Sequence, residues 1–196
     1  MLSEYRGFHC QHRSDDFPII RDIIATHRPS IAIELGTDAG GFAALLADTV
    51  AAWGGHAWTF DRERKFSQLL LDTTPNLTFV QSDVLAEYDR TLTKLIDDHE
   101  PVLLYCDDGN KVREIAMYGA LLNVGDLLAT HDYNTEVPSA WVEPFLATLG
   151  FEPEGHARME ALRNQWYPEP MTRFWVRRRR MLAYVDLNCD PPQVHV

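Results

Sequence analysis

The sequence lacks a long apolar run, a paired cysteine pattern and an excess of positive charge. No stretch of it approaches the ~20 apolar residues that a membrane-spanning helix needs, so we expect no membrane partner. The three cysteines, Cys10, Cys106 and Cys189, are far apart and form neither a CxxC pair nor a zinc-finger spacing. The first residues are polar and lack the pattern of a secretory signal. These absences predict a cytoplasmic protein with reduced cysteines.

The charge of the chain weighs against binding to nucleic acid. Aspartate and glutamate number 29 against 18 lysines and arginines, which gives a net charge of −11. Contacts with phosphates need a basic face. A short basic run, Arg177 to Arg180, is interpreted as a solvated strand end, with a basic recognition patch as the weaker alternative.

The length and the hydrophobic pattern predict one domain in which strands and helices alternate. Expected strands are residues 31–35, 56–60, 77–80, 101–106 and 126–130, and expected helices are 16–25, 41–53, 66–71, 85–99, 112–122 and 139–149. Two late strands, 151–158 and 172–178, follow with a loop at 164–171. This order predicts an α/β fold: a Rossmann-like, doubly wound, mostly parallel sheet with an antiparallel C-terminal edge strand. We expect residues 1–180 to form the domain, with 1–29 as an N-terminal lid and helix region, and 181–196 to form a tail.

The turn after the first of these strands indicates a nucleotide-type cofactor. The strand ends near Glu34, and the turn that follows carries Gly36, Gly40 and Gly41 before a helix begins. Such a turn brings backbone close to a ligand at the carboxyl end of a strand. The spacing is not GxGxxG, and Asp38 inside the turn would repel a diphosphate. A cationic cofactor with an amino acid end, such as S-adenosylmethionine, fits better than a nicotinamide dinucleotide.

Acidic residues recur at the ends of successive strands: Glu34, Asp61, Asp83, Asp107 and Asp132. In an open α/β sheet the carboxyl ends of the strands share one edge, where ligands bind. One such residue alone is usually a turn residue or a helix cap, but five in succession favour a functional edge. Asp61, 25 residues after Gly36, is placed to accept hydrogen bonds from ribose hydroxyls.

Five segments together resemble class I S-adenosylmethionine-dependent methyltransferases. They are residues 33–41, Thr59 to Asp61, Ser82-Asp83, Leu104 to Lys111 and Val124 to Tyr133. The last two segments are similar to the branch that includes cephalosporin-hydroxylase-like and macrocin O-methyltransferases. The resemblance covers about residues 7–178.

The resemblance implies roles for individual residues. The cofactor would be bound by Glu34, Gly36, Thr37, Asp38, Gly41, Asp61, Asp83 and Asp107, with Asp61 on the ribose and Asp83 beside the adenine. A divalent ion would be held by Asp107 and Asp132, with His131 as a third ligand. Oxygen ligands suit Mg²⁺, whereas a histidine ligand favours Mn²⁺, Zn²⁺ or Fe²⁺. The sequence departs from the family here: Tyr133 follows Asp132 where catechol-type enzymes have asparagine, and His131 stands where the cephalosporin-type branch has an acid. Metal binding is therefore left open, with a hydrogen-bonding core histidine as the alternative for His131.

Lys111 and Asp107 are the candidate catalytic residues. A lysine with a lowered pKa serves as a general base, but a lysine at a helix start also pairs with a carboxylate such as Asp108. Two other segments have two interpretations each. Residues 166–170, Trp-Tyr-Pro-Glu-Pro, are either a wall of the acceptor pocket or a packed surface loop. His9 and His12 are of the metal-ligand type, but a polar surface segment is the favoured interpretation.

The sequence thus predicts a methyltransferase that uses S-adenosylmethionine, with the hydroxyl of a small molecule or sugar as the acceptor and a divalent metal ion as an open question. The alternatives are a non-catalytic S-adenosylmethionine-binding protein and, less favoured, a nicotinamide-dependent oxidoreductase. A small-molecule acceptor is the expected partner, and a homo-oligomer is left open.

Overall fold

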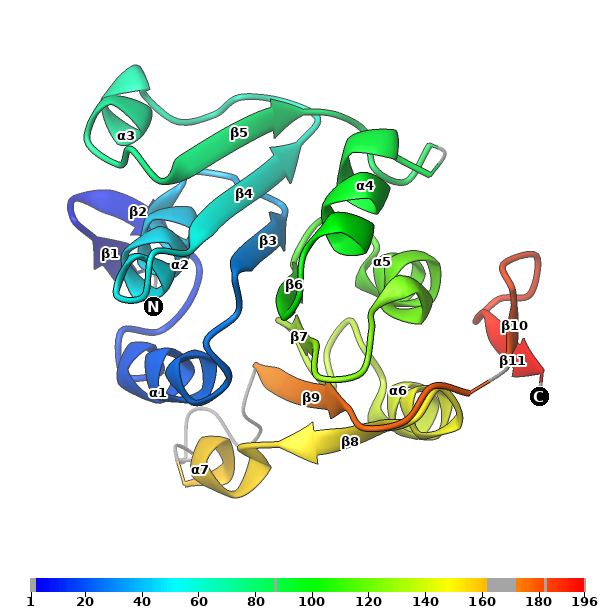
Figure 1. Cartoon of the computed structure of the whole chain (residues 1–196). Helices are drawn as coiled ribbons and strands as arrows, with labels where there is room; N and C mark the ends of the chain where they lie inside the picture. The colour runs from blue at the N-terminus through cyan, green and yellow to red at the C-terminus, as the bar shows by residue number, and fades with distance from the viewer. Residues whose placement is uncertain (1–2, 87, 162–171, 182, 196) are drawn as a thin grey trace.

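The protein, a computed structural model, is described here for residues 3–86, 88–161, 172–181 and 183–195. Its centre is a seven-stranded sheet in the order β5-β4-β3-β6-β7-β9-β8 (Figure 1). The strands are β3 (Ile31–Leu35), β4 (His56–Asp61), β5 (Leu77–Gln81), β6 (Val102–Cys106), β7 (Leu127–Thr130), β8 (Phe151–Glu154) and β9 (Arg173–Arg177).

The sheet is mostly parallel, as the sequence predicts. β3, β4, β5, β6 and β7 pair in parallel, whereas β9 pairs antiparallel with both β7 and β8. Every residue of β3 and β6 is buried, which explains why both strands are apolar, apart from Glu34 of β3, rather than alternating. The antiparallel strand expected at the C-terminal edge is β9, and it lies one place inside the edge because β8 takes the outer position.

Helices cover both faces of the sheet, so the molecule has two cores. The side chains of α1 (Phe17–His27), α2 (Gly41–Ala51), α3 (Gln68–Asp72) and α7 (His156–Glu160) pack on one face, with Ala32 of β3. Those of α4 (Arg90–Asp98), α5 (Lys111–Tyr118) and α6 (Ser139–Thr148) pack on the other, with Ile31 and Ile33 of β3. A short 3₁₀ helix, η1 (Gly119–Leu121), follows α5. No helix among the described residues has the length and apolar character that a bilayer crossing needs.

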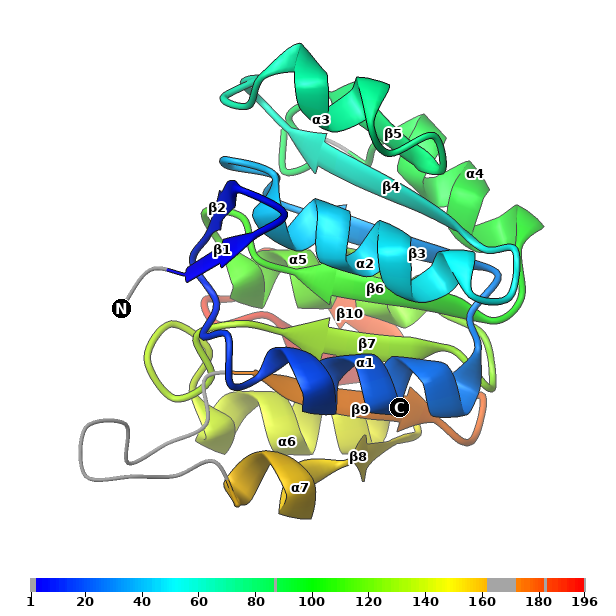
Figure 2. The same cartoon turned by 90° about the vertical axis from the view of Figure 1, so that its left-hand side faces the viewer.

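An N-terminal hairpin packs at the carboxyl end of the parallel strands. It consists of β1 (Ser3–Tyr5) and β2 (Phe8–Cys10) and lies against α2 (Figure 2). A Cβ on Gly41, the first residue of α2, would lie 2.3 Å from the carbonyl oxygen of His9. Glycine is therefore required for the hairpin to approach the start of α2 this closely.

The structure corrects three details of the sequence-based assignment. The strand expected at 151–158 ends at Glu154, because Gly155 adopts a positive φ of 64° and α7 begins directly after it. The helix expected from residue 85 begins only at Arg90, after Asp89 caps it by accepting from Leu92 N. The segment expected to form only a tail carries a second hairpin, β10 (Tyr184–Asp186) with β11 (Gln193–His195). The predicted loop at 164–171, which includes the aromatic segment 166–170, lies outside the described residues.

The basic run at the end of β9 is not a uniformly solvated strand end. Arg178, Arg179 and Arg180 are exposed, but Arg177 is buried. Its guanidinium donates to the carbonyl oxygens of Ala120, at 2.9 Å, and Leu122. Arg177 thus satisfies carbonyl groups that the end of η1 leaves without a helical partner.

Replacement of Arg177 by methionine should lower the free energy of unfolding by about 2–4 kcal/mol, because the buried carbonyl of Leu122 and the partly buried carbonyl of Ala120 lose their donor. Urea unfolding followed by circular dichroism measures this change. The matched control is Arg178→Met, which should stay within about 0.5 kcal/mol of the wild type because Arg178 is exposed. Equal effects of the two substitutions would contradict the buried role.

Candidate functional site

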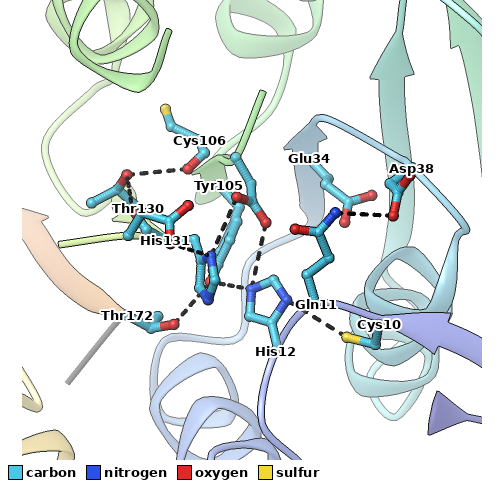
Figure 3. Close-up of polar contacts among 12 residues, drawn as sticks. Cys10, Gln11, His12, Glu34, Asp38, Tyr105, Cys106, Thr130, His131 and Thr172 are labelled. Carbon is cyan, nitrogen blue, oxygen red and sulfur yellow. Dashed lines mark hydrogen bonds and ion pairs between the residues drawn. The ribbon is translucent and has the colours of Figure 1, made fainter. Parts of the chain in front are cut away.

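A cavity of about 220 Å³ opens at the carboxyl ends of β3, β4 and β6, under the N-terminal segment. Most of the site residues expected from the sequence line it: Glu34, Gly36, Thr37, Asp38, Gly41, Asp61, Asp107, Lys111 and Asp132. Figure 3 shows Glu34 and Asp38 on one side of the site and His12, His131 and Tyr105 on the other. The sheet therefore gathers residues from nearly 100 positions of sequence into one space.

The turn between β3 and α2 depends on Gly36. Its φ is +96°, and a Cβ there would lie 2.4 Å from the carbonyl oxygen of Asp107. Both facts exclude a side chain, since the left-handed region and the missing space each disfavour one. The turn can consequently lie against the end of β6, where Asp107 N donates to Leu35 O at 2.9 Å.

Glu34 is a buried carboxylate that one threonine hydroxyl holds directly. It is 1% exposed and accepts a hydrogen bond from Thr59, whose hydroxyl also lies 2.6 Å from that of Thr37. Burial raises the pKa of Glu34 well above its ordinary value, and the hydrogen bond from Thr59 opposes that rise only in part. The charge of Glu34 therefore depends on what occupies the cavity beside it.

Asp61 is oriented by the backbone. Its two carboxylate oxygens accept from Asp38 N at 3.1 Å and from Glu63 N at 3.0 Å. The residue ends β4 and is buried, yet it lines the cavity. A carboxylate has about four lone-pair sites, so this one keeps capacity for hydroxyl donors from a ligand.

Asp83 lies apart from this group. It is exposed and accepts from Leu85 N at 3.1 Å within its own turn. It lines a second cavity, of about 290 Å³, with Arg62, Leu85, Ala86, Asp108, Gly109 and Asn110. Asp108 and Gly109 line both cavities, so the two adjoin along the segment after β6.

Lys111 lies among three carboxylates. Its Nζ is 2.8 Å from Glu136 Oε2, 3.0 Å from Asp132 Oδ2 and 3.5 Å from Asp107 Oδ1. Burial acts to lower the pKa of Lys111, but these carboxylates outweigh it and raise that pKa above its ordinary value. The geometry therefore favours a fixed cation over the general base expected from the sequence.

His131 joins the same cluster from the end of β7. Its Nδ1 lies 3.5 Å from Asp107 Oδ1 and 3.3 Å from Asp132 Oδ1. Burial acts to lower the pKa of His131, yet the hydrogen bonds and charges of the two aspartates raise it to about 9. Burial also acts to raise the pKa of Asp132, and His131 and Lys111 together lower it to about 2.

His12 is the site residue that the sequence interpretation missed. The interpretation of these histidines as part of a polar surface segment is correct for His9, which is exposed. It is wrong for His12, which is 1% exposed. The His12 ring stacks on Phe42 with a centroid distance of 3.7 Å, and its Nε2 lies 2.7 Å from the Tyr105 hydroxyl. Burial lowers the pKa of His12 well below its ordinary value. No local pattern marks this position, because its partners lie far along the chain.

The described residues contain one group of three side chains suited to a metal ion: His12, Asp107 and His131, whose ligand atoms lie within 4.8 Å of one another. Two of the three ligands expected from the sequence, Asp107 and His131, belong to it. Asp132 lies beside the group, and its Oδ2 faces Lys111.

Comparison with known proteins shows similarity in structure only. No family model matches the sequence, and no curated protein sequence matches it. A structure of CmcI with SAH is 19% identical with a TM-score of 0.62, covering 90% of this chain and 81% of that chain. A structure of CmcI with Mg and SAM is 18% identical with a TM-score of 0.65, covering 88% and 76%.

A SAM-dependent O-methyltransferase from Thermotoga maritima is 14% identical with a TM-score of 0.58, covering 87% of this chain and 67% of that chain. At these identities the likeness establishes the fold. The chain thus has the fold of S-adenosylmethionine-dependent methyltransferases, and the expected Rossmann-like architecture is confirmed.

Glu114 supports the segment that both cavities share, and its ionisation should make stability depend on pH. It is fully buried and accepts from Asp108 N at 3.3 Å and Asn110 N at 3.2 Å. Burial, followed by the charge of Asp108, raises its pKa to about 8. Between the ordinary value of 4.5 and about 8 the folded state binds more protons than the unfolded state. Folding is therefore destabilised as pH rises through this window.

Glu114→Gln should remove that dependence while it keeps one of the two acceptor oxygens. As the pH rises from 5 to 8, the free energy of unfolding of the variant should increase by about 2–4 kcal/mol relative to that of the wild type. Above pH 8 the difference should stay constant. Urea unfolding at a series of pH values measures this difference. A difference that stays constant across the series would contradict the raised pKa.

Proposed function

We propose that this protein transfers a methyl group from S-adenosylmethionine to a hydroxyl group of a small molecule. The observation that carries the proposal is the lining of the cavity: a glycine turn beside the carboxylates Glu34, Asp38 and Asp61. The sulfonium and the amino group of this cofactor are cations, so an acidic lining attracts them. The SAH and SAM named with the CmcI structures support the same choice.

The cofactor would extend through both cavities. Its methionine part would lie in the cavity that Gly36, Thr37 and Gly41 line, beside Glu34 and Asp38. Asp61 would accept from the ribose hydroxyls, because its backbone partners fix its direction at the end of β4. The adenine would enter the second cavity, where Asp83 is available to accept from an exocyclic amine.

The acceptor would bind on the side of Asp107 and Lys111. The bound cofactor supplies an electrophilic methyl group, and the protein's own task is to orient the attacking oxygen. Asp107 is partly exposed to the cavity and would accept a hydrogen bond from the acceptor hydroxyl. Lys111, kept protonated by its carboxylates, would stabilise negative charge that develops on that oxygen.

A divalent ion belongs to this proposal as an additional component. The ligands expected from the sequence are Asp107, His131 and Asp132. They lie close together, because His131 Nδ1 is 3.5 Å from Asp107 Oδ1 and 3.3 Å from Asp132 Oδ1. When bound, such an ion lowers the pKa of a coordinated hydroxyl. These residues offer an imidazole nitrogen as well as carboxylate oxygens, and this donor set suits an ion softer than Mg²⁺.

Two rival functions are separated by ligand binding and turnover. A nicotinamide-dependent oxidoreductase would bind NAD in calorimetric titration and leave S-adenosylhomocysteine unbound. A non-catalytic protein would bind S-adenosylmethionine without transferring labelled methyl groups to any of a broad panel of phenols, sugars and other alcohols. The proposal expects S-adenosylhomocysteine binding, no NAD binding and methyl transfer to at least one panel member.

Asp61→Asn should weaken S-adenosylhomocysteine binding by about 10–100-fold, because hydrogen bonds to a charged acceptor contribute about 1.5–3 kcal/mol. Isothermal titration calorimetry gives the affinity, and thermal unfolding without ligand checks that the fold is retained. The control is Asp98→Asn on α4, whose side chain pairs with Lys94 outside the site. Asp61→Asn with wild-type affinity would refute the ribose role.

A further inference from the structure

We propose that His12, Asp107 and His131 form a centre for a divalent transition ion of the Mn²⁺, Fe²⁺, Co²⁺ or Zn²⁺ type, with His12 as a ligand supplied by the N-terminal segment. The three residues come from three separate places: the segment after β2, the end of β6 and the end of β7. The proposal concerns ion binding alone, so it can fail while the methyl-transfer proposal holds, and the reverse.

The carboxylate of Asp107 contacts one nitrogen of each of the two imidazole rings. Its Oδ2 is 3.7 Å from His12 Nε2, and its Oδ1 is 3.5 Å from His131 Nδ1. The ring centroids are 4.2 Å apart (Figure 3). Metal–ligand bonds of about 2.0–2.2 Å to nitrogen and oxygen would draw these atoms together around one ion by shifts of about an ångström or less.

The donor types choose the class of ion. Two ring nitrogens and one carboxylate are a set that Zn²⁺ and its first-row neighbours accept, with water or substrate in the open positions. Mg²⁺ prefers a near-octahedral shell of oxygens. Within the group of three, Asp107 is the sole source of oxygen, so Mg²⁺ would have to draw most of its shell from water.

Lys111 strengthens this preference. Its ammonium group lies 3.0 Å from Asp132 Oδ2 and 2.8 Å from Glu136 Oε2, and its distance to Asp107 Oδ1 is longer, at 3.5 Å. These carboxylate oxygens would have to lose their ion pairs with Lys111 before they could coordinate Mg²⁺. The second oxygen of Asp132, Oδ1, lies 3.3 Å from His131 Nδ1.

The ring of His12 is held in place by its neighbours before any ion binds. It stacks on Phe42 with an interplanar angle of 4°, and its Nδ1 lies 3.6 Å from Cys10 Sγ. The Tyr105 hydroxyl bonds Nε2 in this structure and also lies 3.1 Å from Thr172 Oγ1. Tyr105 therefore keeps a partner when an ion takes the Nε2 position, so the exchange leaves no buried hydroxyl without a hydrogen bond.

A bound ion would join the N-terminal hairpin to the sheet. The hairpin already contacts α2 through the close approach of His9 to Gly41 and through the hydrogen bond from Tyr5 to Asp48. Coordination of His12 would add a link from the same segment to the ends of β6 and β7. Ion binding should therefore raise thermal stability and protect the segment before α1 from proteolysis.

Metal binding by the chelator-treated protein tests the centre directly. Equilibrium dialysis with Mn²⁺, Co²⁺, Zn²⁺ and Mg²⁺, each alone, should give one equivalent of transition ion bound at least about tenfold more tightly than Mg²⁺. Co²⁺ should add visible absorption bands that report nitrogen ligands. A preference for Mg²⁺, or the absence of saturable transition-ion binding, would overturn the proposal.

The variants assign the ligand. His12→Ala should weaken Co²⁺ binding at least about tenfold and alter its visible spectrum, whereas His9→Ala, in an exposed position three residues earlier, should leave both unchanged. Tyr105→Phe keeps His12 and should retain binding, which separates ligation from loss of a hydrogen bond. If His12→Ala fails to fold, His12→Gln gives the same comparison with less loss of packing. Unchanged Co²⁺ affinity and spectrum in a folded His12 variant would show that His12 is not a ligand.

Discussion

The site depends on one close contact, the packing of the Gly36 turn against the end of β6. A side chain at residue 36 would collide with the carbonyl group of Asp107, so the absence of a Cβ lets two neighbouring strand ends lie together. Asp107 N donates to Leu35 O across the same contact. The cavity, its acidic lining and the direction of Asp107 all follow from this approach.

Charge is distributed unevenly around that contact. On the side of β7, the cations Lys111 and His131 lie among the carboxylates of Asp107, Asp132 and Glu136. On the side of β3 and β4, Glu34 and Asp61 are held by hydroxyl and backbone donors, which carry no full charge. A cationic ligand on this second side would balance the charge of the carboxylates there, and it would also favour the ionised form of Glu34.

Much of the fold was predictable because burial on both faces leaves apolar runs such as Val102 to Cys106 in the sequence. The acids at strand ends were predictable for a related reason, since parallel strands present their carboxyl ends at one edge. His12 was not, because it acquires its role from Tyr105, 93 residues away. Arg177 was misjudged for the same reason: its partners, Ala120 and Leu122, lie in a distant turn. The sequence does not show whether a charged side chain finds a hydrogen-bond acceptor far along the chain.

A crystal structure of the complex with S-adenosylhomocysteine tests the central claim most directly. The account predicts the ribose hydroxyls within hydrogen-bonding distance of Asp61, the amino acid end beside Gly36 and Glu34, and the adenine in the cavity that Asp83 lines. Two results would contradict this account. One is S-adenosylhomocysteine bound away from the Gly36 turn, and the other is a structure at saturating ligand with no ligand in either cavity.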